Sequence, residues 1–287
     1  MMRSTVGLLC VSVALAMAAG GCGKVGNMSP VDGSSTDGRV VIDAASNDGA
    51  APAALGTQQN PARTCAELSV AGMPSAAYWL RGVAGPAFQV YCEQTLNGGG
   101  WAMLENSVRR DDGMTATFWQ FGYDDRLKQR GTPAADQNYY DGSLYLLGTQ
   151  YMDVVTDLED TTRLAALMTA TGINATTMKL NEPRWLGGDV DIYNAQFAGG
   201  WSAKDHDEDL LSGDNCAIVY GNVAQHYNAC WVYNLGADAD VDANGSRLDG
   251  GVGPHVGNTA LTALGLALQP DGGAYSQVKR IARFTRW

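Results

Sequence analysis

The pattern of apolar and polar positions divides the chain into three parts. An uncharged apolar run, Val6 to Ala19, follows a single basic residue, Arg3. The next stretch, Gly23 to Thr64, contains no aromatic residue and is dominated by Gly, Ser, Asp, Asn, Ala and Pro. From Cys65 onward, short alternating apolar segments are separated by Gly-rich and polar turns, a pattern typical of short strands.

This third part is predicted to be an α+β domain with short strands and little helix. Leu164, Leu167 and Met168 recur at helical spacing, so one helix is expected over Thr161 to Ala170. The predicted strands are Phe88 to Cys92, Trp101 to Ser107, Tyr151 to Leu158, Cys216 to Tyr220 and Val278 to Thr285.

The first apolar run is interpreted as an export signal, because it is too short to span a bilayer comfortably and follows a basic residue. It ends in Ala19-Gly20-Gly21-Cys22, which resembles a bacterial lipobox, whose Cys receives diacylglycerol and becomes the new N-terminus. Residues 1–22 are therefore predicted to be a signal peptide and Cys22 the lipidation site. By the same analogy, Gly23 in place of an acidic residue implies an outer-membrane or cell-surface lipoprotein. The alternative is cleavage after Ala18, which would leave a secreted protein.

Residues 23–63 are predicted to be a flexible tether. Their composition cannot bury enough apolar surface to offset the entropy lost on ordering. A flexible chain of this length has an end-to-end distance of roughly 35 Å, enough to hold a domain off a membrane surface. The run Val40-Val41-Ile42 is the exception, and we favour no structure for it over an added strand.

Composition limits the classes of function. With 45% hydrophobic residues in 287, the chain can build one sizeable core or two small ones. The formal net charge of -11 argues against a nucleic-acid partner, because such binding relies on Lys and Arg at phosphates. The 36 Gly, 12 Tyr and 7 Trp favour a loop-rich module over a helical bundle.

Four of the six cysteines fall in the domain: Cys65, Cys92, Cys216 and Cys230. An exported protein meets an oxidising environment, where disulfides persist, and three pairings remain open. A zinc site is the alternative, but the closely spaced Cys pairs of such sites are absent.

The opening of the domain resembles the fibrinogen C-terminal domain family. Thr-Cys-Ala-Glu-Leu at 64–68, Phe-Gln-Val-Tyr-Cys-Glu at 88–93 and Gly-Gly-Gly-Trp at 98–101 carry the resemblance, which extends over 64–287. It implies short antiparallel sheets, many loops and a Cys65–Cys92 disulfide. The intelectins, a related lectin family, share this opening and diverge afterwards, so they are a second relative.

A second stretch, residues 205–234, resembles the family's calcium loop and second disulfide, Cys216–Cys230. Asp205, Asp207 and Asp209 place three carboxylates within five residues, and calcium prefers oxygen ligands. The resemblance implies a site made by the side chains of Asp207 and Asp209 and the carbonyls of Leu211 and Gly213. The alternative is a solvated acidic loop. A further run, Asp240 to Gly245, lacks the closing Glu of an EF-hand and is interpreted as a turn.

The family's ligand pocket lies beside the second disulfide and is shaped by a cis peptide before its Cys. The resemblance therefore implies ligand contacts at Tyr227, Asn228, Ala229, Cys230 and Trp231. Trp231 stands where the family has His, and His226 where it has Trp, so specificity for acetylated sugars is in doubt. A Trp can still stack on a sugar ring. The alternative for Tyr227 and Trp231 is packing against the disulfide.

No catalytic residue is predicted, because the sequence lacks the motifs of serine hydrolases, zinc proteases and phosphate-binding loops. The enzyme alternative is a paired-carboxylate glycosidase using acids such as Asp157, Glu159 or Asp189. The predicted function is a calcium-dependent, lectin-like or adhesive module that binds glycans at the cell surface and touches the membrane only through its lipid. The alternative is a protein-binding adhesion or assembly module.

Overall fold

The computed structural model describes residues 53–82, 85–110, 114–236, 253–270 and 273–287. Residues 51–287 form one compact unit. The predicted signal peptide, Cys22, the Val40-Val41-Ile42 run and the acidic run Asp240 to Gly245 lie outside the described residues. No helix in the described ranges is long and apolar enough to cross a membrane.

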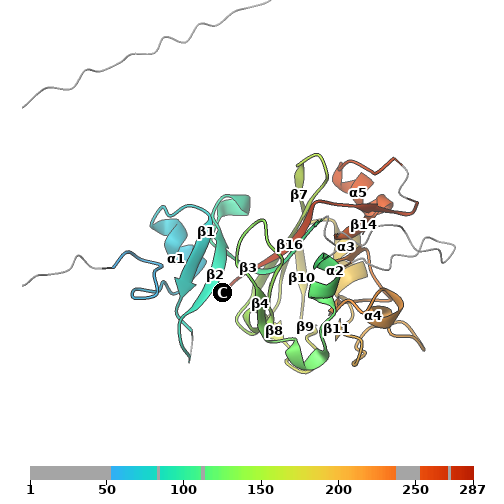
Figure 1. Ribbon diagram of the computed structural model, residues 1–287, viewed down its shortest axis with the longest axis horizontal. Helices are drawn as coiled ribbons and strands as arrows, with labels where there is room; N and C mark the ends of the chain where they lie inside the picture. The colour runs from blue at the N-terminus through green and yellow to red at the C-terminus, as the bar shows by residue number, and fades with distance from the viewer. Residues whose placement is uncertain (1–52, 83–84, 111–113, 237–252, 271–272) are drawn as a thin grey trace, which may run out of the picture. The chain divides into compact units, whose positions relative to one another are not determined.

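A nine-stranded antiparallel sheet forms the centre of this unit (Figure 1). The C-terminal strand β16 lies in the middle of the sheet, hydrogen-bonded to β3 on one side and β6 on the other. In spatial order the main strands are β1 (Ala76–Leu80), β2 (Phe88–Glu93), β3 (Trp101–Val108), β16 (Arg280–Arg286), β6 (Gln150–Thr156), β7 (Thr162–Thr169) and β10 (Arg184–Gly188), while β5 (Tyr139–Asp141) pairs with β3 and with β4 (Gln129–Gly131).

Short helices and small sheets fill the rest of the described chain. The helices are α1 (Cys65–Val70), α2 (Met114–Trp119), α3 (Val190–Phe197), α4 (Cys216–Val219) and α5 (Asn258–Leu264), with 3-10 turns η1 (Leu96–Gly98), η2 (Tyr123–Asp125) and η3 (Gly142–Leu146). The small sheets are β8 (Gly172–Ile173) with β9 (Leu180–Asn181), β11 (Trp201–Ser202) with β12 (Gln225–His226), and β13 (Tyr233–Asn234) with β14 (His255–Gly257) and β15 (Tyr275–Gln277).

Aromatic side chains dominate the main core. Trp201 is fully buried and packs against Tyr140 and Phe121, with ring centroids 5.1 and 6.1 Å away. A second, smaller cluster contains Trp101 and Phe284, both fully buried. Buried aromatic rings contribute large apolar areas, so a domain with little helix still acquires a dense interior.

The described residues contain two disulfides, which join the pairs that the resemblance implies. Cys65 bonds to Cys92 with a Cα–Cα distance of 5.4 Å, and Cys216 bonds to Cys230 with 5.2 Å. Both distances lie in the usual range. Each bond closes a modest loop and is worth on the order of 3 kcal/mol by chain entropy.

The predicted strands are confirmed in β2, β3, β6 and β16, but the predicted helix over Thr161 to Ala170 is wrong. That segment is strand β7, paired with β6 and β10. The ladder between β6 and β7 contains a bulge, so Ala165 and Ala166 are both buried instead of alternating. The bulge spoils the two-residue period and produces a spacing that resembles a helix.

The predicted strand Cys216 to Tyr220 is also wrong, because this segment forms helix α4. The side-chain oxygen of Asn215 accepts hydrogen bonds from Ala217 N at 2.8 Å and Ile218 N at 3.3 Å. Asn in this position is a favoured helix N-cap, and here it starts a helix over residues with high strand propensity.

The folded domain begins before Thr64, so the predicted tether, 23–63, is too long at its C-terminal end. Ala62 is fully buried and hydrogen-bonds through its backbone to Trp79 and Arg81. Gly56 accepts a further bond from Trp79 N at 2.8 Å. Residues 53–63 therefore line the edge of β1 as part of the domain.

The triple glycine forms the tight turn expected between β2 and β3. Gly98, Gly99 and Gly100 all have positive φ. A Cβ at Gly99 would lie 2.4 Å from the carbonyl oxygen of Gln94, so a side chain is excluded there by contact as well as by backbone conformation.

Candidate functional site

The predicted pocket residues surround the Cys216–Cys230 disulfide. Tyr227 is fully buried and donates its hydroxyl hydrogen bond to Val223 O at 2.8 Å. Its side chain therefore packs in the interior. This agrees with the alternative in which Tyr227 packs against the disulfide and does not contact a ligand. Ala229 is exposed, and Asn228 and Trp231 are half-buried, so these three reach the surface.

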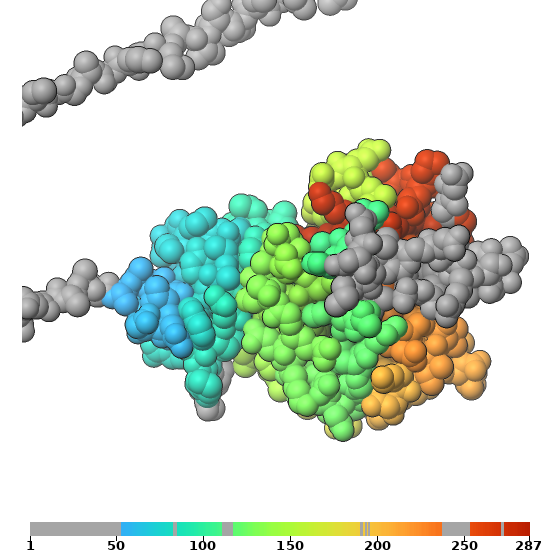
Figure 2. Space-filling model, viewed as in Figure 1, coloured from blue at the N-terminus to red at the C-terminus, as the bar shows by residue number. Residues whose placement is uncertain are grey.

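Trp231 belongs to an aromatic group that we call the tryptophan patch: Tyr220, Trp231 and Tyr275. The ring of Trp231 lies 4.5 Å from that of Tyr275 and 5.4 Å from that of Tyr220. Its indole Nε1 is buried and has no hydrogen-bond partner among the described residues. Ile218 and Val219 of α4, directly before Tyr220, are 56% and 43% exposed. In Figure 2 residues from about 200 to 236 form the orange part of the surface.

The three loop carboxylates do not act together. Asp205 accepts a hydrogen bond from Tyr123 N at 2.9 Å, which fixes the start of η2. Asp207 and Asp209 form a separate pair, because Asp207 Oδ1 accepts from Asp209 N at 3.1 Å. Asp209 in turn accepts from Leu211 N at 2.8 Å and from Cys216 N at 2.7 Å. The carboxylate pair is thereby attached to the first residue of the disulfide.

The electrostatics of this pair suit a cation. Burial raises the pKa of Asp209, and the neighbouring charge of Asp207 raises it further. No group of three or more His, Cys, Asp or Glu side chains that could hold a metal is found in the described part of the chain. A calcium ion here would need backbone carbonyls, such as those of Leu211 and Gly213, and water beside the two carboxylates, a donor set that calcium accepts.

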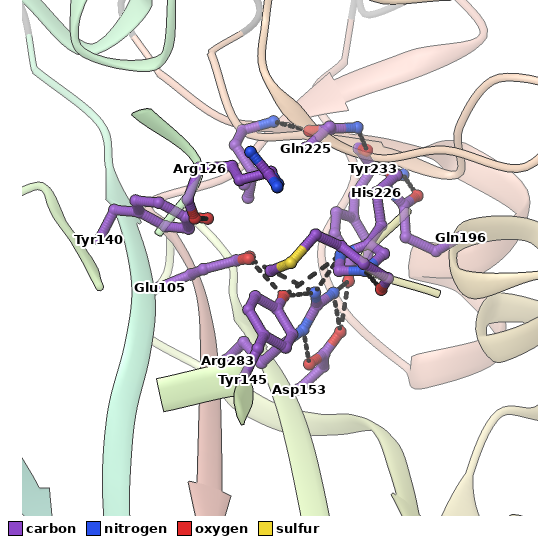
Figure 3. Close-up of polar contacts among 12 residues, drawn as sticks. Glu105, Arg126, Tyr140, Tyr145, Asp153, Gln196, Gln225, His226, Tyr233 and Arg283 are labelled. Carbon is purple, nitrogen blue, oxygen red and sulfur yellow. Dashed lines mark hydrogen bonds and ion pairs between the residues drawn. The ribbon is translucent and has the colours of Figure 1, made fainter. Parts of the chain in front are cut away.

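A buried ionic cluster lies under the strand that leads into Tyr227 (Figure 3). At its centre Arg283, on β16, binds Asp153 of β6 through two hydrogen bonds, of 2.8 and 3.1 Å. The same guanidinium donates to Tyr233 on β13 at 2.5 Å and to Tyr145 of η3. Burial alone would lower the pKa of Arg283, but the adjacent Asp153 and Glu105 raise it, so Arg283 remains charged.

His226 connects this cluster to the pocket wall. Its Nε2 donates to Met178 O at 2.8 Å, since a carbonyl can only accept. The other ring nitrogen, Nδ1, must then be an acceptor, and it lies 3.2 Å from the Nη1 of Arg283. Burial and the charge of Arg283 lower the pKa of His226 to about 3. His226 is therefore a neutral imidazole with both nitrogens hydrogen-bonded.

The cis peptide implied before Cys230 is not present, since the described residues contain no cis peptide bond. Cys230 instead has a positive φ of 88°. Asn228 N donates to Cys230 O at 3.0 Å, and Leu210 N donates to Asn228 O at 2.7 Å. These bonds tie the pocket wall to the acidic loop.

No family model and no curated protein matches the sequence. Among solved structures, the chain is similar to the fibrinogen-like globe domain of human ANGPTL6, with a TM-score of 0.56 and 23% sequence identity. The match covers 79% of this chain and 96% of that one. The fold is fibrinogen-like.

The acids that a glycosidase could use have structural tasks in this fibrinogen-like domain. Asp157 accepts backbone hydrogen bonds from Glu159, Thr161 and Ala267 at 2.8 to 3.0 Å. Asp189 Oδ1 accepts from Ile192 N at 3.2 Å, at the start of α3. Asp157 and Asp189 therefore stabilise a turn and the start of a helix.

Several residues of the site could not be found from the sequence. Arg283 and Asp153 are separated by 130 residues, and Arg283 and His226 by 57. Each is an ordinary charged or polar residue in its own segment. The pairing of β16 with β6 brings Arg283 beside Asp153, and the packing of β12 against the sheet brings His226 there. Tyr275 of the tryptophan patch lies on β15, far from Trp231 in the sequence.

Proposed function

We propose that this protein is an exported ligand-binding module that binds glycans beside the Cys216–Cys230 disulfide, with calcium holding the acidic loop. One observation carries the proposal. Asp209 accepts a hydrogen bond from Cys216 N at 2.7 Å, so the carboxylate pair that would hold calcium is fixed to the disulfide next to Trp231. An ion bound to this pair would stabilise the loop that supports the pocket wall.

The tryptophan patch supports a sugar ligand. A half-buried Trp offers an apolar ring face for the C–H side of a sugar ring. Because the Nε1 of Trp231 is buried, the ring face of Trp231, and not its N–H group, would make the contact. Asn228 and the backbone of Ala229 would supply further polar contacts.

The same surface also favours a protein ligand in one respect. Ile218 and Val219, neighbours on α4, are 56% and 43% exposed, and exposed apolar side chains close together mark protein interfaces. A protein-binding adhesion module is therefore the second candidate.

A glycan array with the full chain separates the two candidates. Binding of acetylated or other neutral sugars in calcium, lost on chelation and lost in Asp207→Asn, supports the glycan proposal. Asp214→Asn is the matched control, because Asp214 is an exposed acid of the same loop. Binding that ignores calcium, or an array without any bound sugar, contradicts the proposal and favours the protein ligand.

The predicted location belongs to the same proposal. Two disulfides indicate an oxidising compartment, and a lipid on Cys22 would hold the domain at the cell surface through residues 23–52. The domain itself would need no contact with the membrane and no catalytic group.

A further inference from the structure

A polar groove lies outside the site described above and is lined by residues of β6, β7 and β10 and of the β8–β9 hairpin. It consists of two pockets of about 340 and 610 Å³ that share Thr171 and Glu182 as lining residues. Arg184 lines the first pocket, and Lys179 and Asn174 line the second. Both volumes are in the range of small-molecule sites, about 300 to 1,000 Å³.

The walls of the groove are held in place from the interior. Asn174 N donates to Lys179 O at 2.9 Å, and Thr171 N donates to Asn181 O at 3.0 Å, which closes the hairpin. Met178, within the hairpin, is fully buried, and its carbonyl accepts the hydrogen bond from His226. A groove with fixed walls loses little entropy when it binds a ligand.

Three charged side chains of the groove are available to a ligand. Lys179, Glu182 and Arg184 are all exposed, and none has a side-chain hydrogen bond or ion pair with the residues that the structure describes. Although the chain carries a net charge of -11, Lys179 and Arg184 form no ion pair with Glu182, which lines the same groove.

The lining chemistry points to a hydroxylated, anionic ligand. Apart from Ala170 and Leu180, every lining residue of the two pockets is polar, so an apolar peptide has little to bind. Arg binds carboxylates through two parallel hydrogen bonds, and Lys binds them as a point charge. Thr, Asn and Glu side chains match sugar hydroxyls as donors and acceptors.

We propose that this groove binds an acidic oligosaccharide, with carboxylates of the ligand at Arg184 and Lys179 and a hydroxyl donated to Glu182. The site does not rest on calcium or on the tryptophan patch. It would give the protein a second contact along a charged glycan chain.

Isothermal titration of the full chain with an oligogalacturonate tests the proposal. We expect Lys179→Gln combined with Arg184→Gln to weaken binding at least tenfold without changing the melting temperature. Arg81→Gln combined with Arg163→Gln is the matched control, because it makes the same change in net charge at two other exposed cations. Chelation of calcium should leave the affinity unchanged, which separates this groove from the calcium-dependent site.

Three further ligands test the specificity: the fully methyl-esterified oligogalacturonate, a polyglutamate of equal length and a sulfated glycan. The fully methyl-esterified oligogalacturonate should bind at least tenfold more weakly, because it lacks the carboxylates, and a polyglutamate of equal length should also bind weakly, because it lacks the hydroxyls. An equal loss of affinity in Arg81→Gln combined with Arg163→Gln would show general charge attraction and overturn the proposal. Absence of binding to oligogalacturonate, equal binding to polyglutamate, preference for a sulfated glycan, or loss on chelation would overturn it as well.

Discussion

Arg283 donates a hydrogen bond to the Nδ1 of His226 at 3.2 Å, and this contact joins the central strand of the sheet to the residue before Tyr227. Because Arg283 also holds Asp153 through two hydrogen bonds, the position of the pocket wall depends on the core of the sheet. The surface beside the disulfide is thus supported by a charge cluster that is fully enclosed.

Replacing Arg283 should destabilise the domain strongly. In Arg283→Met the carboxylates of Asp153 and Glu105 remain buried without their cation, and such a loss costs about 3 to 5 kcal/mol of unfolding free energy. Urea unfolding measures it. Arg163→Met, at an exposed position on β7, should change the unfolding free energy by less than about 0.5 kcal/mol. Equal effects of the two replacements would show that the cluster contributes no more than a surface residue.

His226 should make the domain sensitive to acid. Its pKa is lowered from 6.5 to about 3 in the folded protein, so the unfolded state binds the proton more readily. The contribution of neutral His226 to the unfolding free energy is fully present above pH 6.5. It is lost as the pH falls toward 3, at up to about 1.4 kcal/mol per pH unit. His255, lowered to about 4, acts in the same direction.

Unfolding free energies at several pH values check this dependence. His226→Gln should flatten the slope of unfolding free energy against pH between pH 6 and 4 by up to one proton. A ring of His226 that titrates near pH 6.5 by NMR would contradict the buried neutral imidazole.

The start of the domain can be tested by truncation. A chain beginning at residue 53 should melt like residues 51–287, because Ala62 and the backbone of Gly56 keep their contacts with β1. The unfolding free energy of a chain beginning at residue 64 should be lower by roughly 2 kcal/mol or more, because the core then lacks Ala62 and the partly buried Leu55. Identical melting temperatures of the two truncated chains would show that the domain begins at Thr64.

The lipid anchor remains a prediction from Ala19-Gly20-Gly21-Cys22. In a bacterial expression host that processes lipoproteins, Cys22→Ser should abolish the mass added by diacylglycerol and move the protein from the membrane fraction to the soluble one. Cys10→Ser, within the apolar run, should change neither. A mature mass and fractionation that stay the same in Cys22→Ser would favour cleavage after Ala18.

The sequence was informative where a local motif determines structure. The resemblance to the fibrinogen C-terminal domain family implied the fold and both disulfides, and the structure contains them. Strand β7 was mistaken for a helix, since its bulge is imposed by pairing with β6. Helix α4 was missed because the Asn215 cap outweighs the strand propensity of the residues that follow.

The site was less accessible from sequence than the fold. The resemblance singled out Asp207 and Asp209 among the three loop carboxylates. The hydrogen bond from Tyr123 to Asp205 spans 82 residues and could not be predicted. Burial of Tyr227 could not be deduced from a motif that is exposed or buried according to its neighbours. The Arg283 cluster and the polar groove likewise arise only when distant strands are placed side by side.

Calcium titration followed by thermal unfolding tests the central claim most directly. If Asp207 and Asp209 hold an ion that binds only the folded chain, saturating calcium should raise the melting temperature by several degrees, because binding at 100 times Kd stabilises by about 2.7 kcal/mol. Asp207→Asn should abolish this rise, while Asp214→Asn should retain it. A wild-type melting temperature that does not respond to calcium, or a rise that survives Asp207→Asn, would contradict the account.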